Sequence, residues 1–457
     1  MRTGPPELPG THTTDSPLDR ALALMLADER EAALRWSTAI VDHDHAAASA
    51  LILTCRLLAD FGRTEAAIEG LEVAVKRAID TGNLPLAVAA VADLRQLGKN
   101  VDVMFDAIAQ SFSASSSRLA ETAPPPPPLP SFEKFQPLSS YLTGPALLSK
   151  AQSIVHQARQ QYESERHEAG PTVIAPIPLF SALEVDALRK LIEAFEMITV
   201  PAGKEVIVEG EEGAEAYIVA RGELEVRRSG APAETEEGVP SVTLARLTNG
   251  ALFGEMALLS RAPRAASVVA CRPSILLVAR RDALEKVAEE RPEVGSELAA
   301  HCRRRMFANL VRTSRILMSV HSADRPALVE RFETLVFEKG EKLITAGEEA
   351  SGLHLIASGE VAVVGYENEE PLVITTLGPG EVTGEVALVL RRRANADVVA
   401  VHPTVTLHLP KEDFLSLIKD HPAILLSLYM SAVLRDEETS ALIENSTTNV
   451  ADDYVIV

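Results

Sequence analysis

Most of the structural information in this 457-residue chain lies in one segment, Phe253-Gly254-Glu255-Met256-Ala257-Leu258-Leu259-Ser260-Arg261-Ala262-Pro263-Arg264-Ala265-Ala266-Ser267-Val268. Phe253 ends an apolar run typical of a β-strand, and Gly254 permits a tight turn. A short helix is expected to begin near Glu255, and Pro263 ends the segment before the next strand, which Arg264 is expected to enter. Free N–H groups at a helix start, followed by an arginine, are typical of a phosphate site.

The side chains of this segment suit a sugar phosphate. Arg264 carries a planar guanidinium group that matches two phosphate oxygens, and Glu255 can accept a hydrogen bond from a sugar hydroxyl. The small residues Ala257 and Ala265 allow a ligand to approach the backbone. The alternative is an ion pair between Arg264 and Glu255 in a barrel without a ligand, because a buried unpaired charge is costly.

The surrounding sequence is duplicated. Short runs of valine, isoleucine and leucine broken by glycines predict an antiparallel barrel. Three glycines recur at an offset of 137 residues (340 − 203): Gly203, Gly210 and Gly222 return as Gly340, Gly347 and Gly359. Beyond the loop Ser229 to Pro240 the offset falls to 130 (384 − 254), which places the seven extra residues in that loop. The sequence therefore predicts two barrels of one fold.

The second barrel has a weaker version of the segment: Thr383-Gly384-Glu385-Val386-Ala387-Leu388-Val389-Leu390-Arg391-Arg392-Arg393-Ala394-Asn395-Ala396-Asp397-Val398. In an ungapped alignment Glu385 matches Glu255, but Ala394 stands at the position of Arg264. A slip of one residue could supply Arg393, although strand alternation would turn that side chain to the other face. Asp397 is expected to repel an anion. We predict a degenerate second site at Gly384, Glu385, Ala387 and Ala394.

The pattern G-E-x-A-L-x-x-x-x-P-R-A-A resembles the cyclic nucleotide-binding domain family, which includes the bacterial catabolite activator protein and the regulatory subunits of protein kinase A. The resemblance covers roughly Pro176 to Arg435. It implies a β-roll in which Glu255 binds the ribose 2′-hydroxyl and Arg264 binds the exocyclic phosphate oxygens. The implied ligand-binding set is Gly254, Glu255, Met256, Ala257, Arg264, Ala265 and Ala266. In this family a hydroxyl residue after the arginine often accompanies cGMP preference, so Ala265 favours cAMP over cGMP.

The N-terminal part reads as helical. Apolar residues recur at steps of three and four from about Leu18 to Leu119, and Gly62, Gly82 and Gly98 punctuate them as helix stops. The pieces Thr64 to Thr81 and Leu84 to Leu97 resemble the antiparallel helices of a tetratricopeptide-type repeat. The run Pro124 to Pro128 predicts an extended polyproline II spacer or a ligand for an aromatic-lined domain. A helix is expected from about Pro145 to Glu168.

These patterns predict a multidomain α+β protein. We expect an all-α tetratricopeptide-like domain at 17–119, a proline-rich linker with one helix at 120–175, cyclic nucleotide-binding domains at 176–310 and 311–436, and an acidic tail at 437–457. Helices near Val185 to Phe195, Arg281 to Met318 and Lys411 to Leu434 should flank the two jelly-roll-like barrels. We expect the helical domain to be separable, with proteolysis starting between Leu119 and Thr143.

Composition excludes several classes of protein. Forty-four basic against 65 acidic residues give a net charge of −21, which disfavours nucleic acid binding. The sequence predicts no signal peptide, no membrane span and no metal or disulfide framework from its three cysteines, and therefore a cytoplasmic protein. Asp42-His43-Asp44-His45 is interpreted as a helix start, and His301-Cys302-Arg303-Arg304-Arg305 as the solvated face of a connecting helix.

No catalytic motif is found, so the predicted function is that of a non-enzymatic receptor without a cofactor. In this hypothesis cAMP, or alternatively cGMP, binds the first barrel and the helical domain engages a protein partner. Two alternatives remain: a protein kinase regulatory subunit-like protein, or a ligand-free interaction scaffold. Against the first, Leu119 to Pro176 contains no arginine pair preceding a serine or alanine. A transcription factor like the catabolite activator protein would need a helix-turn-helix after the barrel, and the acidic tail is too short and wrongly charged to be one.

Overall fold

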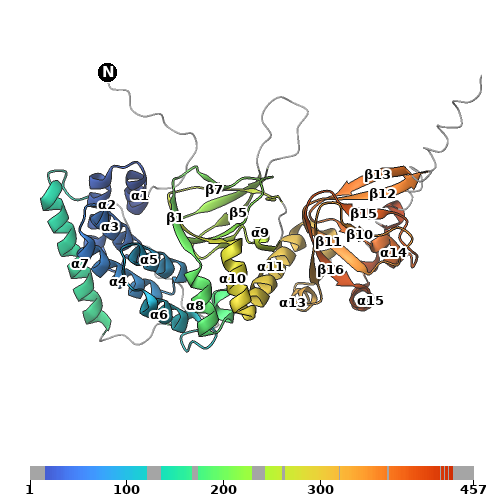
Figure 1. Cartoon of the computed structure of the whole chain (residues 1–457), viewed down its shortest axis with the longest axis horizontal. Coiled ribbons are helices and arrows are strands. Elements are labelled where there is room, and N and C mark those ends of the chain that lie inside the picture. Colours follow the sequence, from blue (N-terminus) through green and yellow to red (C-terminus); the bar gives the residue numbers. More distant parts are fainter. Residues whose placement is uncertain are drawn as a thin grey trace, which may run out of the picture.

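The structure, a computed structural model, places a helical part and two barrels in a row (Figure 1). It describes residues 16–120, 135–166, 173–228, 242–259, 263–318, 320–367, 370–422, 424–426, 428–430 and 432–435. The proline run, the loop Ser229 to Pro240 and the acidic tail lie outside these ranges. The predicted architecture, helices followed by two antiparallel barrels with flanking helices, is confirmed.

The described residues of the N-terminal part form seven helices. They are α1 (Pro17–Leu26), α2 (Arg30–His43), α3 (Ala48–Asp60), α4 (Thr64–Asp80), α5 (Leu84–Gln96), α6 (Asp102–Phe112) and α7 (Gly144–Arg166). Gly62, Gly82 and Gly98 adopt the left-handed conformation that ends α3, α4 and α5, as predicted. The tetratricopeptide label stays a prediction. The interpretation of Asp42 to His45 as a helix start is wrong, since α2 ends at His43.

Each barrel consists of two antiparallel four-stranded sheets, and the strand order is the same in both. In barrel one the orders are β1-β8-β3-β6 and β2-β7-β4-β5. Its strands are β1 (Glu196–Val200), β2 (Glu205–Ile207), β3 (Glu215–Arg221), β4 (Leu224–Arg228), β5 (Val242–Leu247), β6 (Leu252–Phe253), β7 (Ser267–Ala270) and β8 (Ser274–Arg280).

Barrel two repeats this arrangement as β9-β16-β11-β14 and β10-β15-β12-β13. Its strands are β9 (Glu333–Phe337), β10 (Lys342–Ile344), β11 (Gly352–Ser358), β12 (Val361–Glu367), β13 (Glu370–Leu377), β14 (Val382–Thr383), β15 (Asp397–Ala400) and β16 (Thr404–Pro410). Each strand number rises by eight between the barrels. The duplication read from the glycine spacing is therefore present in the three-dimensional structure.

The helical part and barrel one share a single hydrophobic core. Helix α5 packs against β3 and β8, where Ile218 and Leu277 turn their side chains away from the barrel interior. Asp19 of α1 forms an almost fully buried ion pair with Arg221 at the end of β3. The expectation that the helical domain separates from the barrels is therefore wrong, because separation would expose this apolar interface to water.

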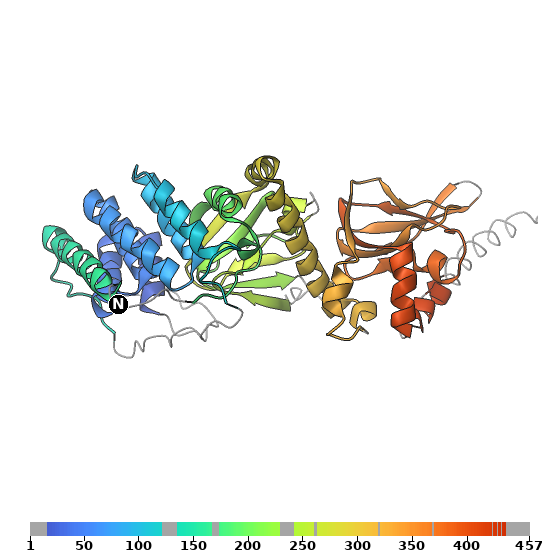
Figure 2. The same ribbon diagram turned by 90° about the horizontal axis from the view of Figure 1, so that it is seen from below.

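Further helices flank the barrels. They are the short 3₁₀ turn η1 (Phe180–Ala182), then α8 (Val185–Glu193), α9 (Met256–Leu259), α10 (Arg281–Glu290), α11 (Pro292–Thr313), α12 (Arg315–Met318), α13 (Arg325–Val329), α14 (Glu385–Val389) and α15 (Lys411–Asp420). A last helix, Ile424–Arg435, follows α15. Helix α11 runs from barrel one toward barrel two (Figure 2).

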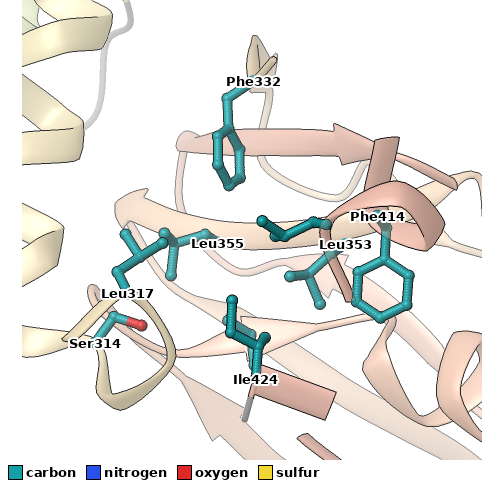
Figure 3. A pocket seen from close by; sticks show the side chains of 9 residues that line it. Ser314, Leu317, Phe332, Leu353, Leu355, Phe414 and Ile424 are labelled. Atoms are coloured by element: carbon teal, nitrogen blue, oxygen red, sulfur yellow. The ribbon is translucent and has the colours of Figure 1, made fainter. Parts of the chain in front are cut away.

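One side of the β9-β16-β11-β14 sheet points away from the barrel interior. Helices α12 and α15 and the last helix cover this side. A small apolar pocket remains between them, lined by Leu317, Phe332, Leu355 and Ile424 among others (Figure 3). No single helix in the described ranges is long and apolar enough to cross a membrane. Helix α15 and the last helix reach that composition only as a pair, bent by 117°.

Candidate functional site

The predicted strand–turn–helix unit of barrel one, called the first cassette here (253–268), is present. Strand β6 ends at Phe253, Gly254 takes a φ of +74°, and α9 begins at Met256. A side chain at Gly254 would be strained and would approach the Glu215 carbonyl oxygen to 3.1 Å, so glycine suits this turn. Helix α9 has only four residues. Its dipole is correspondingly small, so the Arg264 guanidinium group contributes more positive charge here than the start of the helix does.

The Arg264 side chain points back over the turn. Its Nη1 donates to the Gly254 carbonyl oxygen and its Nη2 to the Glu215 carbonyl oxygen, both at 2.9 Å. The guanidinium group is 9% exposed, and burial lowers its pKa from the usual value of arginine. The suggested ion pair with Glu255 does not form; the nearest carboxylate is that of Glu215, at 3.8 Å. Arg264 lies three residues before β7 rather than inside the strand.

Sequence reasoning missed one residue that this arrangement requires. Gly213 lies directly under the guanidinium group, and a Cβ at this position would be 2.3 Å from Nη2 of Arg264. Its counterpart in barrel two, by the offset of 137, is Ala350, which has a side chain at that point. An alignment of the two barrels could have identified Gly213, because the second barrel has neither the arginine nor the glycine.

Glu255 connects the first cassette to the inter-barrel helix. Its side chain is 6% exposed, and its Oε1 lies 3.3 Å from Nε of Arg305 on α11. The Cys302 thiol, also on α11, lies 3.8 Å from the Glu255 carbonyl oxygen, and burial raises its pKa to about 12. The interpretation of His301 to Arg305 as a solvated face is therefore wrong for His301 and Cys302, which are buried.

The second cassette (383–398) makes the same contact with its own following helix. Nη1 of Arg435 donates to Oε1 of Glu385 at 2.6 Å. Arg435 and Arg305 differ by 130 positions (435 − 305), the same offset that relates Glu385 to Glu255. Burial raises the pKa of Glu385, and Arg435 opposes that shift. The glutamate–helix ion pair is thus a shared feature of both barrels.

Backbone hydrogen bonds fix the register of the two cassettes. In barrel one, Gly210 N–H donates to the Arg264 carbonyl, and Arg264 N–H donates to Glu211. In barrel two, Gly347 N–H donates to the Ala394 carbonyl and Ala394 N–H to Glu348, all four bonds measuring 2.8–2.9 Å. Ala394 therefore occupies the Arg264 position, as the ungapped alignment predicts. Arg393 is exposed and donates to the Gly347 carbonyl oxygen.

Other residues of barrel two also differ from their counterparts. Asp397 does not present a free charge to the cassette, contrary to expectation. It is buried and accepts hydrogen bonds from Lys342 Nζ at 2.6 Å and from Ala346 N–H at 2.7 Å. Inside the barrel the rings of His354 and His408 lie in contact, tilted by 38° with centroids 4.5 Å apart, where barrel one has Tyr217 and Val278.

No group of three or more histidine, cysteine, aspartate or glutamate side chains in the described ranges could hold a metal ion. The chemistry of the first cassette instead suits an anion. It combines a backbone-held guanidinium group, a glycine turn and a carboxylate that can accept from hydroxyls. The ligand roles of Gly254 to Ala266 remain predictions, as does the loss of ligand binding at Gly384, Glu385, Ala387 and Ala394.

Comparison with known proteins bears on the whole C-terminal part. Residues 197–291 and 334–421 each match the cyclic nucleotide-binding domain family. A cAMP-dependent protein kinase regulatory subunit of Yarrowia lipolytica is 29% identical over 308 residues, which cover 67% of this chain and 76% of that protein.

Two solved structures are also similar. The regulatory domain of Toxoplasma gondii PKA with cAMP is 24% identical, with a TM-score of 0.28, and the match covers 56% of this chain and 92% of that one. The Thermus thermophilus catabolite activator protein is 32% identical, with a TM-score of 0.27, and the match covers 30% of this chain and 61% of that one. The two matched segments coincide with the two barrels of equal strand order, so the chain has two domains that match the cyclic nucleotide-binding domain family and is similar to a cAMP-dependent protein kinase regulatory subunit.

Proposed function

We propose that this protein is a non-enzymatic receptor that binds one cyclic nucleotide, cAMP in preference to cGMP, in the first cassette. The observation that carries the proposal is the position of Arg264. Its guanidinium group is held by two carbonyl oxygens at 2.9 Å, so a phosphate meets a cation that is already in place. Preorganisation of this kind reduces the entropy lost on binding. Ala265, which lacks a hydroxyl group for a guanine amino group, favours cAMP.

The contacts of Glu255 support an allosteric role. A ribose hydroxyl that donates to the Glu255 carboxylate would compete with Arg305 for the same group, which lies against α11. Because α11 leads to barrel two, ligand binding would favour one position of this helix over another. A ligand can shift such an equilibrium only by its difference in affinity for the two states. The helical part is fused to barrel one, so we propose that it serves as a fixed platform for a protein partner.

Regulation of a protein kinase is the second candidate, and the name of the Yarrowia relative favours it. Arg227-Arg228-Ser229 has the arginine pair and following serine that an inhibitory kinase site would contain. Arg227 and Arg228 lie in β4, where Arg227 pairs with Glu225 of the same strand. Strand β4 is paired on both sides, with β5 and β7, so this segment is not free to enter a kinase active site.

Equilibrium binding of a fluorescent cAMP analogue tests the main proposal. The full chain should bind the analogue, and cAMP should displace it at lower concentration than cGMP. AMP is the matched control. It has the same base and sugar as cAMP but an open phosphate, and it should displace the analogue poorly. The proposal is wrong if no cyclic nucleotide displaces the analogue. In that case the scaffold alternative gains support, and a kinase inhibition assay with and without cAMP then addresses the second candidate.

A further inference from the structure

The last helix, Ile424–Arg435, is apolar on both sides. One row of side chains spaced by four residues, Ile424, Leu428 and Ala432, is buried against barrel two, where Ile424 lines the apolar pocket (Figure 3). The opposite row is exposed and also apolar. We call it the outer face: Leu425, Leu426, Tyr429, Met430 and Leu434, which are 36–67% exposed. A helix that is apolar all round is normally covered on all sides.

The duplicated barrel provides an internal comparison for the outer face. The offset of 130 residues aligns the last helix with α11. The positions on α11 that match the outer face are occupied by Gly295, Ser296, Ala299, Ala300 and Arg304. None of these is a large apolar residue, so the large apolar side chains of the outer face are specific to the second copy of this helix. Five large exposed apolar side chains on one short helix indicate a contact surface.

We propose that the outer face is covered by the end of the same chain, the apolar block Tyr454-Val455-Ile456-Val457. The described part of the chain ends at Arg435, directly after the outer face. Eighteen residues, 436–453, then precede the apolar block. A random coil of eighteen residues would span about 20–25 Å. The outer face, from Leu425 to Leu434, is about 14 Å long at 1.5 Å per residue. The block can therefore reach every part of it.

Connection within one chain favours this occupant over a second copy of the protein. A connection of this length within one chain would give an effective concentration in the millimolar range, so a contact too weak to hold two molecules together can persist within one. The net charge of −21 also repels a second copy. The apolar block itself carries no charged side chain, and the acidic residues of the tail lie before it. The sequence of the tail is thus a polar segment followed by the apolar block.

Disulfide trapping in the full chain tests this assignment. In a Cys271→Ser background the pair Met430→Cys and Val455→Cys should form an intramolecular disulfide at least ten-fold faster than the control pair Val373→Cys and Val455→Cys. Val373 is equally accessible, being 60% exposed on β13 of the same barrel. Equal rates for the two pairs would show that the tail does not bind the outer face. Preferential disulfide-linked dimers through Met430→Cys would assign the face to a second copy instead.

A second measurement does not depend on introduced cysteines. Val455→Asp with Ile456→Asp in the full chain, and a chain ending at Arg435, should both bind more of the dye 1-anilinonaphthalene-8-sulfonate than the unmodified protein. Both should also self-associate in sedimentation experiments as the outer face becomes accessible. If neither variant differs from the unmodified protein, the apolar block does not cover the helix. The test is independent of nucleotide binding, because it involves neither cassette.

Discussion

Replacing Gly213 by alanine should weaken nucleotide binding without unfolding the protein. The added methyl group would lie 2.3 Å from Nη2 and 2.4 Å from Nε of Arg264. Ordinary contacts between such atoms are about 3.5 Å, so the guanidinium group has to move by about 1 Å. That movement disrupts the two hydrogen bonds to carbonyl oxygens that now aim it at the cassette.

The size of the effect follows from the kind of contact that is lost. Hydrogen bonds to charged groups contribute about 1.5–3 kcal/mol, which corresponds to a loss of about ten- to 150-fold in affinity. The folded state should lose at most about 1.5–3 kcal/mol, the value of hydrogen bonds to a charged group, and should stay folded. The clashing atoms belong to the end of a flexible side chain, Gly213 does not have a positive φ, and alanine reduces the entropy of the unfolded chain.

Fluorescence anisotropy with a labelled cAMP analogue measures the change, and thermal unfolding without ligand measures stability. Gly378→Ala is the matched control, since a Cβ there meets no atom within 4 Å. Arg264→Ala sets the largest loss expected, about thirty- to a thousand-fold. Binding by Gly213→Ala that equals that of Gly378→Ala would refute the role assigned to the Arg264 position. A loss of binding that follows unfolding would refute it as well.

Three other predictions concern the two barrels. Ala350→Gly combined with Ala394→Arg should create a second nucleotide site. Ala394→Arg alone should not, because the Ala350 methyl group occupies the space that the guanidinium group needs. The stoichiometry measured by calorimetry distinguishes the two variants. Arg305→Ala should destabilise the nucleotide-free protein by about 1–2 kcal/mol in denaturant unfolding, since Glu255 is 4% exposed and loses its cation. Burial lowers the pKa of His354 to about 3, so its contribution to stability is present above pH 6.5 and is lost as the pH falls from 6.5 towards 3. The unfolding free energy should fall by about 1 kcal/mol between pH 7 and pH 5.5, and by clearly less in His354→Gln.

The sequence was sufficient to predict the barrels and the register of the cassettes. Glycine spacing requires only that turns recur, and a turn with positive φ accepts glycine at little cost. The position of Ala394 followed from the same spacing, and the backbone hydrogen bonds of Gly210 and Gly347 agree with it. The expectation that strand alternation turns Arg393 to the other face had the wrong physical basis, because neither Arg264 nor Ala394 lies inside a strand.

The contacts between elements could not be predicted in the same way. The pairing of Glu255 with Arg305 joins residues fifty positions apart (305 − 255), and nothing in local periodicity relates them. The fusion of the helical part to barrel one was missed for a related reason. The outward side chains of β3 and β8, such as Ile218 and Leu277, read as ordinary strand residues until the face that covers them is known. Packing partners far apart in sequence are set by the tertiary fold.

The central claim is that one cassette of the two binds a cyclic nucleotide. Isothermal titration of the unmodified chain with cAMP measures this directly, because it gives the number of sites and their affinity in one experiment. The account predicts one cAMP per chain, and binding to the Arg264→Ala variant that is at least about thirty-fold weaker. Two sites per chain, or one site of unchanged affinity in the Arg264→Ala variant, would contradict it.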